Sequence, residues 1–239
     1  MIRWAAVLAG ALAGTQASPA ADCRLALVLA MDVSSSVDAG EDALQRAGLA
    51  RALLAPEVAA AFLHPPQPVA LAVFEWSGRD NQKLLLDWTL IRERADLEQA
   101  SRALAGSTRS TDQFPTALGH AVGYAAILLQ SAPPCIAQTI DVSGDGRNNE
   151  GFTPRQAYAH FPFDGVTVNG LAIETAGNSG ASETFGDAVM AEYYREHLLL
   201  GPNAFVQEAG GFADFERAMR RKLLRELGGA ALSRMEQRP

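Results

Sequence analysis

The chain has 239 residues, of which 48% are hydrophobic and 20% are charged, and its formal net charge is −7. This length fits one large domain, and the apolar content is enough for a sizeable core, which excludes a disordered protein. The acidic balance excludes nucleic acid as an electrostatically favoured partner.

The first 21 residues are expected to be a secretory signal peptide. Arg3 supplies a positive charge, Trp4 to Ala13 is a run of apolar residues and glycine, and small residues surround Pro19. That run is too short for a bilayer, which takes about 20 residues. We expect an exported protein, periplasmic or secreted, with one domain over 22–229, a tail over 230–239 and no membrane span after signal removal. An uncleaved anchor or a disordered tag is the alternative.

Short apolar runs alternate with helical patterns along the rest of the chain. Strands are expected over Leu25–Met31, Val69–Trp76, Lys83–Thr89, Ile136–Val142, Val166–Ile173 and Ala204–Gln207. Helices are expected over Glu41–Phe62 with a break at Pro56, Ile91–Leu104, Thr116–Leu129, Pro154–His160, Asp187–His197 and a stripe from Phe212 to Leu227. The alternation predicts an α/β fold with a doubly wound, mostly parallel central sheet and one antiparallel edge strand.

Two segments late in the chain are expected at the surface. Glu174 to Phe185 is rich in Gly, Ser and Thr and is interpreted as a surface loop. The one dense basic stretch is interpreted as a solvated helix face and consists of Arg220, Arg221, Lys222 and Arg225.

Oxygen-bearing side chains stand directly after the first and fourth apolar runs. Asp32, Ser34 and Ser36 follow the first, and Asp145 follows the fourth. In open α/β sheets ligands bind at the carboxyl ends of strands, and such oxygens suit hard cations. Two carboxylates brought together would repel, so a bound cation is the simplest way to hold both ionised.

Two other interpretations of these residues exist. Asp32 and the serines after it could merely cap the first helix, because Asp and Ser are favoured there. Asp141 to Phe152 partly fits a calcium-binding loop, but Phe152 stands where that loop requires glutamate, and Asp141 falls inside the predicted fourth strand. We reject the calcium loop.

The segment Asp32 to Ser36 resembles the DxSxS signature of the metal-ion-dependent adhesion site (MIDAS) of von Willebrand factor A domains. Thr116, which opens a small-residue helix, and Asp145-Gly146 resemble the family's other two elements, in the family's order. The resemblance implies that Ser34 and Ser36 bind a divalent cation, Thr116 directly or through water. Asp32 and Asp145 act mainly through waters or hydrogen bonds, and one position stays open for a partner's carboxylate.

The chain departs from the family's pattern next to the threonine. The family commonly has glycines there, and this chain has Phe114 and Pro115. Because proline fixes φ and lacks an N–H, we expect a stiffer or differently placed loop around Thr116.

Further stretches resemble one uncharacterised bacterial branch of this superfamily, which carries a domain-of-unknown-function label. They are Glu75–Gly78, Trp88–Ile91, Ile140–Gly146 and Gly201–Val206, and with them the resemblance covers roughly Cys23 to Leu227. Three residues near strand ends are candidates to support the metal ligands or to contact a partner: Glu75, Ser143 and Asn148.

In the topology that this resemblance implies, the first and fourth strands are parallel neighbours. Cys23 lies nine residues before Asp32, and Cys135 lies ten before Asp145. Both cysteines should therefore start adjacent strands, at the end opposite the metal. Neighbouring strands lie about 4.8 Å apart, within reach of disulfide geometry. We predict a Cys23–Cys135 disulfide, which an oxidising compartment would preserve.

The expected function is an adhesion-type, metal-dependent protein- or ligand-binding module outside the cytoplasm. One divalent cation, Mg²⁺ with Mn²⁺ or Ca²⁺ as alternatives, would bind an acidic group of an unknown partner. The alternatives are a metal-dependent hydrolase and a structural domain whose metal only stabilises loops. The sequence has no GxSxG elbow, P-loop or dinucleotide fingerprint, so we expect a protein that is not an enzyme and assign no catalytic residue.

Overall fold

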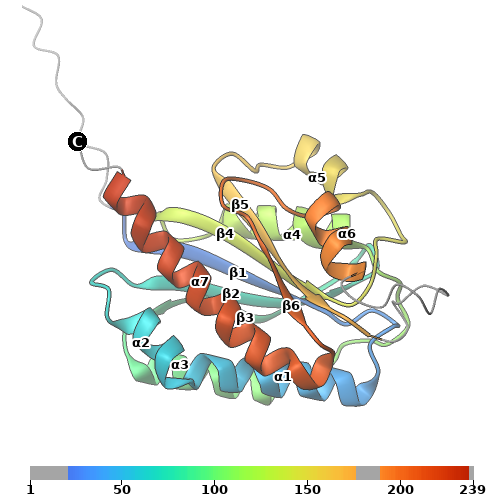
Figure 1. Cartoon of the computed structure of the whole chain (residues 1–239), viewed down its shortest axis with the longest axis horizontal. Helices are drawn as coiled ribbons and strands as arrows, with labels where there is room; N and C mark the ends of the chain where they lie inside the picture. Colours follow the sequence, from blue (N-terminus) through green and yellow to red (C-terminus); the bar gives the residue numbers. More distant parts are fainter. Residues whose placement is uncertain (1–20, 176–188, 237–239) are drawn as a thin grey trace, which may run out of the picture.

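A six-stranded sheet with the order β3-β2-β1-β4-β5-β6 runs through the molecule (Figure 1). The computed structural model describes residues 21–175 and 189–236, with side chains as far as residue 228. The strands are β1 (Cys23–Asp32), β2 (Val69–Ser77), β3 (Asn81–Ile91), β4 (Cys135–Gly144), β5 (Val166–Ile173) and β6 (Val206–Ala209). Neighbouring strands are parallel except β2 and β3, which form the expected antiparallel pair at one edge.

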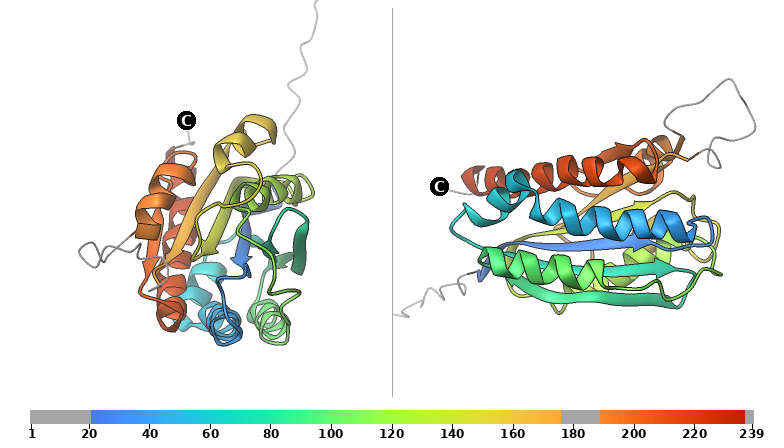
Figure 2. Two further views of the ribbon diagram at one scale, coloured as in Figure 1. Left: turned by 90° about the vertical axis from the view of Figure 1, so that its right-hand side faces the viewer. Right: turned by 90° about the horizontal axis from the view of Figure 1, so that it is seen from below.

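Helices cover both faces of this sheet (Figures 1 and 2). On one face lie α1 (Ala39–Leu54), α2 (Pro56–Leu63), α3 (Arg94–Ala105) and α7 (Phe215–Glu236), the last after a 3₁₀ turn at Phe212–Asp214. On the other lie α4 (Leu118–Leu129), α5 (Pro154–His160) and α6 (Val189–His197). The predicted doubly wound α/β fold is therefore confirmed.

The central strand β1 shows why its sequence is an unbroken apolar run. All ten of its residues are buried. Successive side chains of a strand point to opposite faces, so Leu25, Leu27 and Leu29 pack under α1 and α7, whereas Ala26 and Val28 pack under α4. A strand covered on both sides has no solvent face and needs no polar alternation.

The helix boundaries follow local signals. The predicted helix over Glu41–Phe62 breaks before Pro56, which becomes the first residue of α2, a position that needs no backbone N–H. Thr116 lies two residues before α4 rather than inside it. Helix α7 continues to Glu236, past residue 230, where the tail was expected to begin. Residues 1–20 of the expected signal peptide, and 176–185 of the expected surface loop, lie outside the described residues.

The predicted disulfide is present between Cys23 and Cys135. The two residues are register partners at the amino ends of β1 and β4, with their Cα atoms 4.5 Å apart. The prediction is confirmed because parallel strands of nearly equal length start together as well as end together.

One part of the basic stretch in α7 lies in the interior. Lys222 is fully buried and contacts two carboxylates, those of Asp141 and Glu226. The expectation of a solvated helix face is therefore wrong for Lys222. Its place is set by helical spacing, because Lys222 falls three residues after Met219, on the buried stripe of the helix.

Of the helices in the described segments, none combines the length and the apolarity that crossing a bilayer would require.

Candidate metal site

The five residues expected to form a metal site lie together near the carboxyl ends of β1 and β4. These strand ends are on the right of Figure 1. Ser36 Oγ donates to Asp145 Oδ1 over 2.7 Å and lies 3.1 Å from Ser34 Oγ. Thr116 Oγ1 donates to Ser34 Oγ over 3.2 Å, and the Ser34 N–H donates to Asp32 Oδ1 over 2.7 Å. The β1, β4 and α4 segments thus contribute to one connected cluster of oxygens.

This cluster is not a helix cap. The Asp38 carboxylate caps α1 by accepting from the Glu41 N–H, and the Glu41 carboxylate accepts from the Asp38 N–H, which completes a capping box. The capping role considered for Asp32 is therefore already filled six residues later in the chain.

The cluster is buried on one side and open on the other. Asp32 and Ser34 are fully buried, Asp145 and Thr116 are nearly so, and Ser36 is exposed. A ligand would therefore approach from the Ser36 side, with the two carboxyl groups behind it.

The electrostatics of the two carboxyl groups favour a cation between them. Burial, and then the negative charge of Asp145, raise the pKa of Asp32 to about 7, and hydrogen bonds from Ser34 and the charge of Arg109 offset this only in part. Burial also raises the pKa of Asp145. A divalent cation would lower both values by favouring the ionised forms.

The space around the carboxyl groups also fits a bound group. Asp32 Oδ2 and the Tyr194 hydroxyl are buried without a hydrogen-bond partner. A Cβ on Gly144 would lie 2.7 Å from each of these oxygens, and a Cβ on Gly146 would lie 2.6 Å from Thr116 Oγ1. Glycine at both positions keeps this space open. The donors are all oxygens, which suits a hard cation such as Mg²⁺.

Sequence reasoning missed three side chains that shape the site. Arg109 Nη2 donates to the Val33 and Ser34 carbonyls, and Gln45 Nε2 donates to the Asp32 carbonyl. The Tyr194 hydroxyl, from α6, lies beside Gly144 as Asp32 Oδ2 does, each 2.7 Å from where a Cβ on Gly144 would stand. Arg109 and Tyr194 lie far from Asp32 in the chain, and Gln45 lies 13 residues from it, on α1, so the motif itself pointed to none of the three.

Thr116, directly after the Phe114-Pro115 segment, contacts the site loop, because its Oγ1 donates to Ser34 Oγ. The Phe114 carbonyl accepts from the Ser35 N–H over 2.8 Å, and the Pro115 carbonyl accepts from the Gly78 N–H over 2.7 Å. These bonds tie the loop to the site loop and to the β2–β3 turn. Because they use the carbonyl groups of both residues, the missing proline N–H is of no consequence here.

The other three candidates occupy different places. Ser143 lies behind the site and donates to Gln45 Oε1 and the Ala30 carbonyl over 3.3 Å each. Asn148 Oδ1 accepts from the Gly119 N–H at the start of α4. Both support the elements that carry the site.

Glu75 is not available to a partner. Its side chain is fully buried, it pairs with Arg46, and its Oε1 accepts from the Ser110 N–H over 2.8 Å. The candidate partner contact is therefore wrong. The physical reason is that the loop after α3 folds over the end of β2 and seals this carboxylate from solvent.

Within the described segments, no group of three or more His, Cys, Asp and Glu side chains is arranged to hold a metal ion. The cluster at Asp32 differs from such a group because three of its five side chains are hydroxyls.

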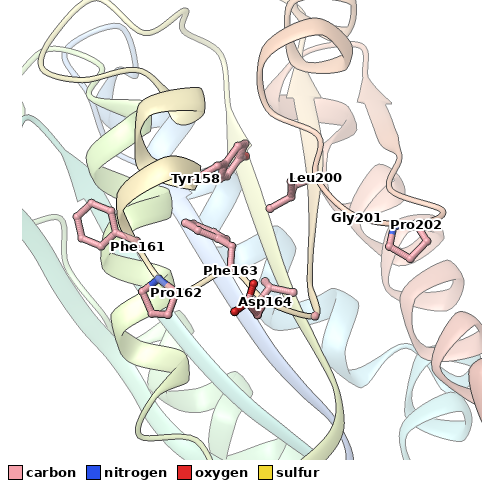
Figure 3. Close-up of a pocket in the computed structure, with 10 residues that line it drawn as sticks. Tyr158, Phe161, Pro162, Phe163, Asp164, Leu200, Gly201 and Pro202 are labelled. Carbon is pink, nitrogen blue, oxygen red and sulfur yellow. The ribbon is translucent and has the colours of Figure 1, made fainter.

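A surface pocket of about 350 Å³ between Tyr158, Phe163 and Leu200 (Figure 3) lies at the start of β5, at the sheet end opposite the cluster.

The raised pKa of Asp32 predicts a pH dependence. Because this pKa, about 7, lies above the ordinary value of 3.8, the folded metal-free chain holds a proton that the unfolded chain releases. Its stability should therefore fall as pH rises from about 4 to about 7. Mg²⁺ binds the ionised form, so its affinity should rise about tenfold per pH unit below 7 and then level off.

Urea unfolding with EDTA and Mg²⁺ titration, both at pH values on either side of 7, check these opposite trends. Asp32→Asn is the control, since it keeps the shape and removes the titration. A Mg²⁺ affinity independent of pH across this range would contradict the prediction.

A family model described as "Protein of unknown function (DUF1194)" matches residues 22–231. A search of curated proteins found no match.

Solved structures share the fold at low sequence identity. Proximal thread matrix protein 1 from the mussel byssus, with a zinc-occupied MIDAS motif, is 14% identical over 87% of this chain and 48% of that one, with a TM-score of 0.59. A von Willebrand factor type A protein from Catenulispora acidiphila is 15% identical over 86% of this chain and 43% of that one, with a TM-score of 0.58. The PilB minor pilin from Streptococcus sanguinis is 11% identical over 90% and 63%, with a TM-score of 0.56. This chain spans less than two thirds of each of these proteins.

Proposed function

Because the chain belongs to the family described as protein of unknown function DUF1194 and has a von Willebrand factor A fold, we propose that it is an exported binding module that depends on a divalent cation. The observation that carries this proposal is the connected cluster of two buried carboxyl groups and three hydroxyl groups, open at Ser36. The module would bind an acidic group of a protein or other ligand.

The five residues of the cluster would play different roles in binding the cation. Ser34, Ser36 and Thr116 would offer neutral hydroxyl oxygens to the ion. Asp32 and Asp145 would orient those hydroxyls and balance the charge from behind. A divalent ion held partly by neutral ligands keeps enough positive charge to attract a carboxylate from a partner. Because Ser36 is the exposed member, that carboxylate would arrive beside it.

Two observations support the finer points of the proposal. The oxygen-only donor set favours Mg²⁺, or Mn²⁺ and Ca²⁺, over metals that prefer nitrogen and sulfur, although the mussel protein of the same fold carries zinc in its MIDAS motif. The Cys23–Cys135 disulfide supports export to the periplasm or beyond, because disulfides persist in oxidising compartments.

Calorimetric titration with Mg²⁺ tests the metal site. We expect saturable binding by the wild-type chain and at least about a tenfold loss of affinity in Asp32→Ala. A tenfold loss corresponds to only about 1.4 kcal/mol of binding free energy. Asp112→Ala is the matched control, because it removes an exposed carboxylate from the nearby loop. Equal affinities for wild type and Asp32→Ala would show that the cluster is not the metal site.

Binding of a partner group needs its own measurement. We expect the Mg²⁺-loaded chain to bind an immobilised peptide with one glutamate better than the same peptide with glutamine, and EDTA to abolish the difference. A chain that binds Mg²⁺ and treats the two peptides alike would instead have a metal that only stabilises its loops.

A further inference from the structure

A second polar cluster lies away from the candidate metal site, between α7 and the sheet. Its members are Asp141 on β4, Asn169 on β5, and Lys222 and Glu226 on α7. Lys222 Nζ lies 3.0 Å from Asp141 Oδ1 and donates to Glu226 Oε1 over 2.8 Å. The three ionisable side chains are 0% to 1% exposed. The cluster therefore holds an amine and two carboxyl groups, sealed from water.

The amine meets the two carboxyl groups in different ways. Toward Glu226 it makes a hydrogen bond, whereas both oxygens of Asp141 lack a hydrogen-bond partner in spite of the 3.0 Å contact. The Lys222 nitrogen thus lies within ion-pair distance of the Asp141 carboxyl group but without a well-aligned hydrogen bond to it. An amine beside a carboxyl group is the pairing of nucleophile and acyl group that acyl transfer requires.

The charges of the cluster do not balance as ions. One ammonium and two carboxylates would leave a net negative charge in an apolar interior, which is costly. Burial, and then the negative charge of Glu226, raise the pKa of Asp141 above its ordinary value. The raised pKa of Asp141 favours its neutral acid, the form whose hydroxyl can leave as water.

From this juxtaposition we propose that Lys222 and Asp141 condense within the folded chain into an isopeptide bond, with Glu226 as the proton-transfer group. Glu226 takes a proton from the Lys222 ammonium, and the free amine attacks Cγ of the Asp141 carboxylic acid. The new C–N bond forms, the C–OH bond breaks, and the second amine proton passes through Glu226 to the departing hydroxyl, which leaves as water. The products are an amide, one water and a neutral Glu226, with no oxidant or cofactor required.

Neighbouring groups hold these three side chains in place. Asn169 Nδ2 donates to Glu226 Oε1 over 3.0 Å, and Asn169 Oδ1 accepts from the Phe205 N–H over 3.0 Å. The Phe205 ring centroid lies 4.6 Å from Lys222 Nζ and shields it from water. Asn169 is therefore a positioning residue that orients Glu226, and Phe205 keeps the reaction dry.

The bond would tie α7 covalently to the centre of the sheet. The disulfide already joins β1 to β4, so β4 would carry two cross-links from separate parts of the chain. Such a chain would keep its fold when pulled or attacked by proteases. This inference does not rest on the proposed metal function.

Mass spectrometry of the full chain, purified, denatured and reduced, tests the bond directly. We expect wild type to be lighter than its own sequence by one water, and a tryptic digest to join the peptide of Asp141 to the segment around Lys222. The chain has two lysines, Lys83 and Lys222, so amine labelling in denaturant should modify only Lys83 among them.

Single substitutions test whether Glu226 transfers the protons and whether Lys222 supplies the amine. Glu226→Gln keeps the shape of the side chain and should restore the full mass and labelling of both lysines, and Lys222→Met should restore the full mass. Lys83→Arg, at an exposed position, should still lose one water. A wild-type chain at full mass with two labelled lysines overturns the proposal, whether or not the variants fold. Complete condensation in Glu226→Gln overturns the role of Glu226.

Discussion

Replacing Arg46 with methionine is expected to lower the free energy of unfolding by about 3–5 kcal/mol, the usual loss when a buried ion pair is broken on one side. The Arg46 side chain is 5% exposed and pairs with Glu75, which is fully buried. Its Nε also donates to Asp42, and its Nη1 donates to Ser107 Oγ over 2.7 Å. Methionine would fill the volume but leave the Glu75 carboxylate buried without its cation.

The same substitution should weaken the candidate metal site. Glu75 accepts from the Ser110 N–H, and Ser107 bonds to Arg46, so this ion pair holds the loop that leads to Thr116. Urea unfolding measures the stability, and Mg²⁺ titration measures the site.

Arg51→Met is the matched control for Arg46→Met. Arg51 stands on the same helix and pairs with Glu216, but its side chain is 56% exposed. Exposed pairs contribute about 0–1 kcal/mol, so this variant should unfold almost as the wild type does. Losses of equal size for Arg46→Met and Arg51→Met would contradict the prediction.

Removing the disulfide is expected to lower the free energy of unfolding by about 4 kcal/mol, mainly by freeing the unfolded chain. Cys23 and Cys135 are 112 residues apart in sequence, and closing so long a loop restricts the unfolded ensemble strongly. The measurement is urea unfolding of the double variant Cys23→Ala, Cys135→Ala, and of wild type with and without reductant.

The function of the disulfide variant provides the control. The disulfide lies at the amino ends of β1 and β4, and the candidate metal site at their carboxyl ends. While the variant stays folded, its Mg²⁺ affinity should match that of wild type. The prediction would be wrong if both the variant and the reduced wild type had the same free energy of unfolding as the oxidised wild type.

Much of this fold could be predicted because its signals are local. The apolar run before Asp32 is short and continuous, as in a strand covered on both faces, and Pro56 favours the start of a helix or a break in one. The pairing of Cys23 with Cys135 followed once β1 and β4 were placed side by side, since register then brings their starts together. The convergence of Asp32, Ser34 and Asp145 followed in the same way from where the strands end.

The sequence by itself determined the strands, the α/β fold class and the residues that meet at the carboxyl edge of the sheet, since periodicity and strand ends depend on neighbours along the chain. Only the tertiary structure decided which charged residues are buried. Lys222 and Glu75 look like surface residues in the sequence, and both are buried against partners from distant elements, Asp141 and Arg46. Such contacts join segments far apart in the chain, so no local sequence pattern predicts them.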